Sequence, residues 1–372
     1  MLKTFIKLFL ILGFALIVFT KTSTVLAQFQ ESRYEAQVTK IIEEKQIVTA
    51  GKKQLYQKIE LNIKNGDLKG KKVISENGNI PLSFIPRYGA GDEVYIVKSH
   101  SPEKTEVFLI TDYVRRTPIY LLFLFFAILT ILIGRVRGAL SLLGMAISFL
   151  TIFIYILPNI IAGRDPLLIA ISASVFIIPI TFYLSHGING KTTSAVIGTI
   201  ISMIIIGFLS SIFTELVHLS GFSSDEASFV QALTHGTVNM RGLLLAGILI
   251  GALGVLDDIT ISQSAIVYKL KEANPGLHFG EVWKKTMDIG RDHIASMVNT
   301  LVLVYTGASL PLLLLFTNST VPLGEVVNYE MLAEEIVRTL VASIGLILAV
   351  PITTFIASYL VEFRNKKNLF LK

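Results

Sequence analysis

Two adjacent carboxylates stand inside an apolar stretch of the chain. The stretch covers residues 243–274 and reads LLLAGILIGALGVLDDITISQSAIVYKLKEAN, with Asp257 and Asp258 at its centre. Ionisable groups inside a membrane span are costly and usually mark a path for ions, protons or substrate. The pair therefore predicts a proton or cation site. A second interpretation is that the pair ends the membrane segment and caps the amphipathic helix that follows.

Helical spacing puts small residues and one of the two carboxylates on a single face, which comprises Gly247, Gly251, Gly254, Asp258 and Ser262. Small residues on one face let a second helix approach closely in lipid. The three glycines therefore predict helix packing, and the carboxylate of Asp258 is expected to point at protein rather than at acyl chains.

The packing partner expected for Asp258 is the sixth predicted span, near Asn299 or Thr300, so that a polar path joins the two helices. Loss of water around a carboxylate favours its neutral form, which allows proton exchange. Asp257 is turned about 100° away on the helix and is expected to matter less. Asp258→Asn should then abolish activity while Asp257→Asn keeps much of it. Two mild and similar effects are expected if the pair is only a cap, because Asn caps nearly as well as Asp.

The composition indicates a membrane protein. Hydrophobic residues make up 52% of the 372 residues, and the mean hydropathy is +0.65. Several runs are long enough to span a bilayer. The net charge of +6 does not indicate nucleic-acid binding, because most of the excess lies in loops beside the predicted spans. The chain has no cysteine, which excludes disulfides, thiol chemistry and iron–sulfur clusters.

No familiar catalytic motif is present: the sequence lacks H-E-x-x-H, G-x-S-x-G and a Walker loop. His218 and His235 share one loop, but their spacing matches no compact metal-ligand pattern. We therefore expect neither an enzyme nor a cofactor or metal. Two hypotheses remain. The first is a transporter or export-linked permease that uses the carboxylates. The second is a membrane-anchored interaction or sensing protein that docks an envelope partner or a paralogous subunit.

The hydropathy pattern divides the chain into three parts. Residues 1–27 are predicted to be a signal peptide or an uncleaved first helix, because a basic start precedes an apolar core. Residues 28–117 form an extracytoplasmic domain, and residues 118–372 form an α-helical polytopic membrane domain. About seven transmembrane helices are predicted, at about 118–134, 139–157, 167–185, 193–214, 242–261, 297–316 and 336–360. A cytoplasmic amphipathic segment, 262–296, is expected to lie in the inner headgroup layer as two helices.

The extracytoplasmic domain is predicted to be a small, OB-like β-barrel. Its apolar residues alternate with polar ones, as at Tyr34, Ala36 and Val38, and Asn-Gly pairs mark turns. About five short strands in such a length are typical of a small closed or partly closed barrel. Its strands carry no cluster of basic and aromatic residues on one face, so a nucleic-acid role is not expected.

Two long segments resemble a known family. GALGVLDDITISQSAIVYKLKEANP and IGRDHIASMVNTLVLVYTGASLPLLLL are similar to the signature blocks of the YibE/F family of bacterial multi-pass membrane proteins. The resemblance covers nearly the whole chain and implies a plasma-membrane protein with this order of domains, but no particular activity. The order of an outer domain, an acidic span, an inner amphipathic helix and a polar span also resembles SecD/SecF-type exporters. Here four spans, not two, separate the outer domain from the acidic span.

Basic residues gather in the loops that the predicted spans assign to the cytoplasmic side. They are Arg135, Arg137, Lys191, Lys269, Lys271, Lys284, Lys285 and Arg291, followed by a basic C-terminus. The loops assigned to the outside hold only Arg164 and Arg241, with Arg338 at the outer start of the last span. This asymmetry and the signal peptide predict the same orientation.

Residues 28–117 should therefore lie outside and the C-terminus should lie in the cytoplasm. A cysteine placed at Lys284 should react with a membrane-impermeant thiol reagent only from the cytoplasmic side, and the native chain offers no competing thiol. Labelling of intact cells at this position would contradict the orientation.

Overall fold

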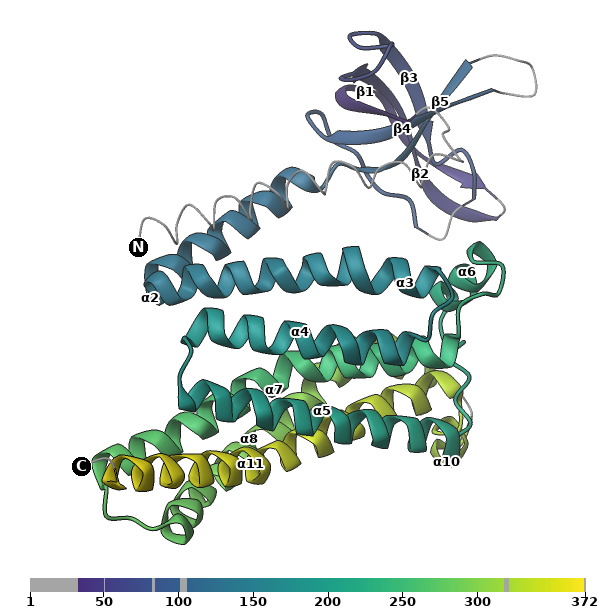
Figure 1. Cartoon of the computed structure of the whole chain (residues 1–372). Helices are drawn as coiled ribbons and strands as arrows, with labels where there is room; N and C mark the ends of the chain where they lie inside the picture. The colour runs from purple at the N-terminus through teal and green to yellow at the C-terminus, as the bar shows by residue number, and fades with distance from the viewer. Residues whose placement is uncertain (1–32, 50, 82–83, 101–105, 318–320, 371–372) are drawn as a thin grey trace. The chain divides into compact units, whose positions relative to one another are not determined.

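The computed structural model describes residues 33–49, 51–81, 84–100, 106–317 and 321–370 (Figure 1). The predicted signal segment 1–27 lies outside these residues. The chain forms two compact units, Met1–Ile128 and Leu129–Lys372. The first contains a β-sheet and the second contains most of the helices.

The sheet has five antiparallel strands in the order β3-β2-β1-β4-β5. The strands are β1 (Arg33–Thr49), β2 (Lys52–Ile63), β3 (Lys72–Asn77), β4 (Glu93–His100) and β5 (Glu106–Tyr113). The predicted alternation is confirmed, because Tyr34, Ala36 and Val38 are all buried. They form a core with Ile59, Leu61 and Ile63 from the neighbouring strand.

The prediction of a barrel is wrong, because the sheet is open. Closure would require the two edge strands, β3 and β5, to share a hydrogen-bonded ladder. These strands approach each other, but the described residues form no such pairing. Alternating polarity indicates that one face of a strand is buried, which is equally true of an open sheet and of a barrel. The sequence pattern therefore could not distinguish the two.

Five helical segments of the described chain are long and apolar enough to cross a membrane, or six if one bent pair forms a single span. They are Arg116–Ile161, Pro166–His186 (α4), Gly190–Leu216 (α5), Met240–Ala273 (α7) and Glu330–Phe363 within α11 (Glu330–Phe370). The bent pair is α8 (Phe279–Ala308) and α9 (Leu310–Thr317), which meet at 70°. The remaining short helices are α6 (Asp225–Leu233) and α10 (Leu323–Val326). Ser224 caps α6, as Ser-Ser-Asp-Glu at 223–226 indicates.

The first of these segments contains a sharp reversal of the chain. It comprises α2 (Arg116–Thr151), η2 (Ile152–Ile156) and α3 (Leu157–Ile161). Arg135 leaves the helical region, with φ 51° and ψ −133°. A Cβ atom on Gly138 would overlap the carbonyl group of Thr130, although eight residues of straight helix extend about 12 Å. The chain therefore turns back at Arg135, within the loop predicted between the first two spans.

The segment 262–296 contains two helices with a break between them, as predicted, but each is part of a longer helix. α7 continues without interruption through both aspartates to Ala273, and α8 begins at Phe279 and runs to Ala308. The ends of these two helices and of α11 share a small apolar core, which contains Val267, Val282 and Val361. The predicted helices in the headgroup layer are thus extensions of α7 and α8 that pack on protein, because an amphipathic pattern fits either a lipid surface or a protein surface.

The helices α5, α7 and α11 pack closely through small and hydroxyl-bearing residues. The hydroxyl groups of Thr199 and Thr260 lie 2.8 Å apart at the contact between α5 and α7. Gly198 lies directly against Thr353 of α11, where a Cβ atom would approach the Thr353 Cα atom to 3.2 Å and overlap its hydroxyl group. Small residues allow this approach of two helix backbones.

Gly198→Ala should therefore destabilise the protein, because the added methyl group meets both the side chain and the backbone of Thr353. We expect a loss of about 1–3 kcal/mol in the free energy of unfolding, measured as a lower Tm of the detergent-solubilised full chain. Gly254→Ala is the matched control, because nothing lies within 4 Å of its added Cβ atom. Alanine also favours a helix by about 1 kcal/mol over glycine, so a similar loss at both positions would contradict the packing described.

Candidate functional site

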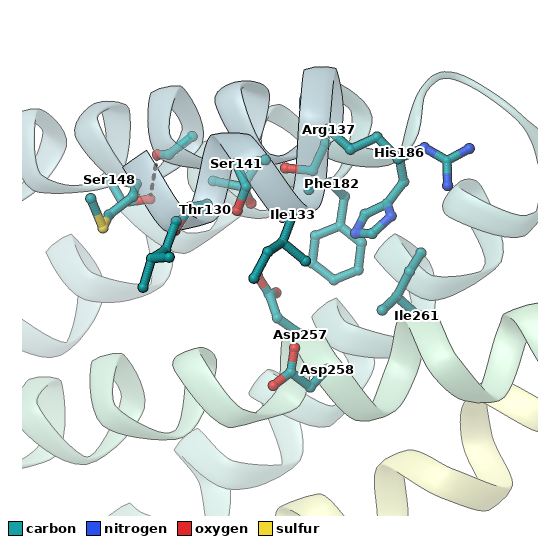
Figure 2. Close-up of a pocket in the computed structure, with 17 residues that line it drawn as sticks. Thr130, Ile133, Arg137, Ser141, Ser148, Phe182, His186, Asp257, Asp258 and Ile261 are labelled. Atoms are coloured by element: carbon teal, nitrogen blue, oxygen red, sulfur yellow. Dashed lines mark hydrogen bonds between the residues drawn. The ribbon is translucent and has the colours of Figure 1, made fainter. Parts of the chain in front are cut away.

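A cavity of about 660 Å³ lies beside the middle of α7 and is lined also by α2 and by the end of α4 (Figure 2). We call it the aspartate pocket. Its polar lining consists of Thr130, Arg137, Ser141, Ser148, Thr181, Ser185, His186, Asp257 and Asp258. Both carboxylates identified from the sequence therefore line one cavity.

The two carboxylates differ in their surroundings. Asp257 is partly buried, and its Oδ1 atom is fully buried without a hydrogen-bond donor among the described residues. Asp258 is exposed. Removing a carboxylate from water without supplying a donor is costly, so such a group generally binds a proton or a cation. This argument applies to Asp257 and not to Asp258.

Basic side chains lie on the other side of the aspartate pocket, as the labels of Figure 2 show. Arg137 follows the chain reversal in α2, and His186 is the last residue of α4. The charged neighbours of His186 are Arg137, Lys191 and Asp258, of which Arg137 and Asp258 line the same cavity. The pocket thus combines carboxylates on α7 with basic groups at the ends of neighbouring helices.

Hydroxyl groups complete the lining. Ser148 donates to the carbonyl of Gly144 at 3.1 Å, and Thr181 donates to the carbonyl of Ile177 at 2.9 Å. A hydroxyl that has given its proton to the backbone of its own helix keeps its oxygen as an acceptor. Oxygen acceptors and a buried carboxylate are suited to a proton carrier or a small cation.

The glycine face of α7 is exposed along most of its length, and among the described residues its packing is limited to one contact at Gly251. We use this name for Gly247, Gly251, Gly254 and Asp258, which are all exposed, as is Ser262 beyond them. A Cβ atom on Gly247 or Gly254 would meet nothing within 4 Å. The buried side of α7 instead carries aliphatic residues, which include Ile248, Leu249, Leu256 and Ile259. Bulky aliphatic contact with α4, α5 and α11 orients the helix and leaves Gly247 and Gly254 uncovered.

The described residues do not form the predicted polar path from Asp258 to α8. Asn299 and Thr300 are exposed and do not line the aspartate pocket. The Thr300 hydroxyl donates to the carbonyl of Ser296, four residues earlier in the same helix. α8 meets the glycine face through Tyr305, whose hydroxyl lies 3.4 Å from the position of a Cβ atom on Gly251.

Sequence reasoning did not identify Arg137 and His186 as neighbours of the aspartates. A signal for both was present in the predicted topology. Arg137 lies in the first predicted inner loop, His186 lies at the inner end of the third span, and Asp258 lies near the inner end of the fifth. All three therefore share one predicted membrane face. The described residues contain no group of three His, Cys, Asp or Glu side chains that could hold a metal ion.

A family model described as YibE/F-like protein matches residues 122–363. The match covers well over half of the 372 residues, both segments that carried the resemblance and all residues that line the aspartate pocket. Comparisons with curated proteins and with solved structures found no match. The chain has several membrane-spanning helices, and it belongs to the YibE/F-like protein family.

Proposed function

We propose that this protein is a transporter or an export-linked permease in which Asp257 is the proton or cation site. The observation that carries the proposal is the buried Oδ1 atom of Asp257, which has no donor among the described residues and belongs to a cavity-lining side chain. Binding of a proton or cation there removes an unpaired charge from the interior of the helix bundle. Asp258, exposed at the same cavity, supplies a second carboxylate.

The proposal includes seven spans. The 46-residue segment Arg116–Ile161 would be about 69 Å long as a straight helix, more than twice a bilayer core of about 30 Å. Counting it as two spans that meet at Arg135, and counting α8 with α9 as one, gives seven. The basic loops then assign the aspartate pocket to the cytoplasmic side and the sheet to the outside.

In this proposal Asp257 alternates between an ionised, empty state and a state in which a bound proton or cation neutralises it. The ionised side chain attracts a proton or cation from the cavity, and the cavity oxygens of Ser148 and Thr181 help to solvate it. The positive guanidinium group of Arg137 opposes a permanently bound cation, because like charges repel. This repulsion favours release of the cation from Asp257, and a carrier must release what it binds.

The alternative function is an interaction or sensing protein whose sheet docks an envelope partner or a paralogous subunit. The open edges of β3 and β5 favour this alternative, because an unpaired edge can accept a further strand. We assign the protein no catalysed reaction and no cofactor under either proposal.

Asp257→Asn should abolish coupled flux, whereas Asp258→Asn should retain much of it. This order is the reverse of the one that helical spacing predicts, because Asp257 is the more buried carboxylate. The measurement is proton and monovalent-cation flux in vesicles reconstituted with the full chain, with and without an imposed pH gradient. We expect a loss of roughly tenfold or more at Asp257, since intramembrane ionisable groups generally serve such paths.

Thermal melting of both purified variants controls for folding. If neither carboxylate takes part in transport, both substitutions will be mild and alike. That result, or the absence of flux driven by either gradient in the wild-type protein, would contradict the transport proposal.

A further inference from the structure

The aspartate pocket carries charges of opposite sign that are not paired with each other. Arg137 and Asp258 both line it, and neither forms an ion pair or a side-chain hydrogen bond with another described residue. Figure 2 shows the two carboxylates on α7 with Arg137 and His186 drawn above them. Each unpaired charge attracts a group of the other sign, so the pocket has one position for a cationic group and one for an anionic group.

The fold, and not only the composition, brings Arg137 to this cavity. The chain reversal at Arg135 returns α2 along itself, and residues of both arms line the pocket, such as Thr130 before the reversal and Ser141 after it. The positive-inside rule accounts for a basic residue in this predicted inner loop, but Arg135 satisfies the rule without lining the cavity. The position of Arg137 opposite a carboxylate is therefore a separate feature of the structure.

The rest of the lining is mainly apolar. It includes Leu129, Ile133, Met145, Phe182 and Ile261. Pockets for small molecules generally have volumes of about 300–1,000 Å³ and combine apolar walls with a few convergent polar groups. The aspartate pocket, at about 660 Å³, has both properties. A ligand that fits it has an apolar body and charged ends.

Resting on the proposed function, we propose that the substrate is a small zwitterion, whose ammonium group binds Asp258 and whose acid group binds Arg137. With a proton or cation on Asp257, this ligand pairs both remaining charges. An anion alone leaves Asp258 without a partner, and an amine alone leaves Arg137 without one, which is costly once water is displaced. Guanidinium groups bind carboxylates and phosphates alike, so amino acids, short peptides and the headgroup of phosphatidylethanolamine share the required chemistry.

Equilibrium binding to the purified full chain in phosphatidylglycerol nanodiscs, measured by calorimetry, tests the ligand class. The probes are leucine, isocaproate and isoamylamine, which share one branched carbon skeleton, together with dileucine as a longer zwitterion. Leucine or dileucine should bind roughly tenfold or more tightly than isocaproate or isoamylamine, because each charged end adds a charge-assisted hydrogen bond.

Two variants assign the ends of the ligand. Arg137→Gln should bind leucine or dileucine no better than isoamylamine, and Asp258→Asn should bind them no better than isocaproate. Asp258→Asn lowers affinity only, so its maximal flux at saturating ligand persists. Arg135→Gln is the matched control, because this arginine is exposed in the same predicted loop and does not line the pocket. It should bind as the wild-type protein does.

A second set of nanodiscs, in which phosphatidylethanolamine replaces part of the phosphatidylglycerol, separates a lipid from a soluble ligand. If the lipid headgroup occupies the pocket, phosphatidylethanolamine should raise the Tm of the wild-type protein but not that of Arg137→Gln, and it should compete with leucine and dileucine. If the ligand is soluble, their affinity should be the same in both kinds of nanodisc. Either result supports a zwitterion and identifies its source.

Binding of isocaproate or isoamylamine as tight as that of the zwitterions would overturn the proposal. So would the failure of leucine, dileucine and phosphatidylethanolamine alike to distinguish the wild-type protein from Arg137→Gln. Binding is measured without an imposed gradient, so this test can fail while the flux test of Asp257 succeeds, and the reverse also holds.

Discussion

The packing of α7 against α5 and α11 is the constraint on which the site depends. Aliphatic residues on one side of α7, among them Leu249 and Leu256, are fully buried, and hydroxyl contacts such as Thr199–Thr260 bring the helices close. Because one side of α7 is held against its neighbours, the residues on the opposite side of the helix must face away from them. Asp257 falls at the border between the two sides, and Asp258 falls on the uncovered one. The difference between two chemically identical neighbours is therefore a result of helix packing.

The aspartate pocket combines features that a simple helix cap does not need. A cap requires one acceptor near the first or last turn of a helix, whereas these aspartates lie in the middle of an unbroken helix of 34 residues. The capping interpretation depended on a break near Asp258, and none is present. What the pocket does contain is a carboxylate oxygen with no donor in the described part of the chain, and Arg137 and His186 from two other elements line the same cavity. Opposite charges that line one cavity without direct pairing leave room for a third group between them.

Hydropathy predicted the positions of the helices well, but it predicted the contacts between them poorly. The spans predicted at 167–185 and 193–214 agree closely with α4 and α5, because long apolar runs with polar ends are unambiguous. Period-two alternation predicted the strands of the sheet but not whether the sheet closes. The glycine spacing correctly placed Asp258 with three glycines on one face of α7. The same spacing does not show whether that face packs against another helix or is exposed. Arg137 and His186, which line the same cavity as Asp257, lie more than 70 positions away from it in the chain, and no local pattern encodes that proximity.

The uninterrupted course of α7 has a mechanical consequence. The helix is about 51 Å long, which exceeds a bilayer core of about 30 Å by some 20 Å. Its far end is held with α8 and α11 by the small core around Val267 and Val282. Since no residue between Gly247 and Val267 departs from helical geometry, a twist applied at that far end turns Asp257 and Gly247 through the same angle. A rotation at one surface of the bundle would thus be transmitted through α7 to the carboxylates.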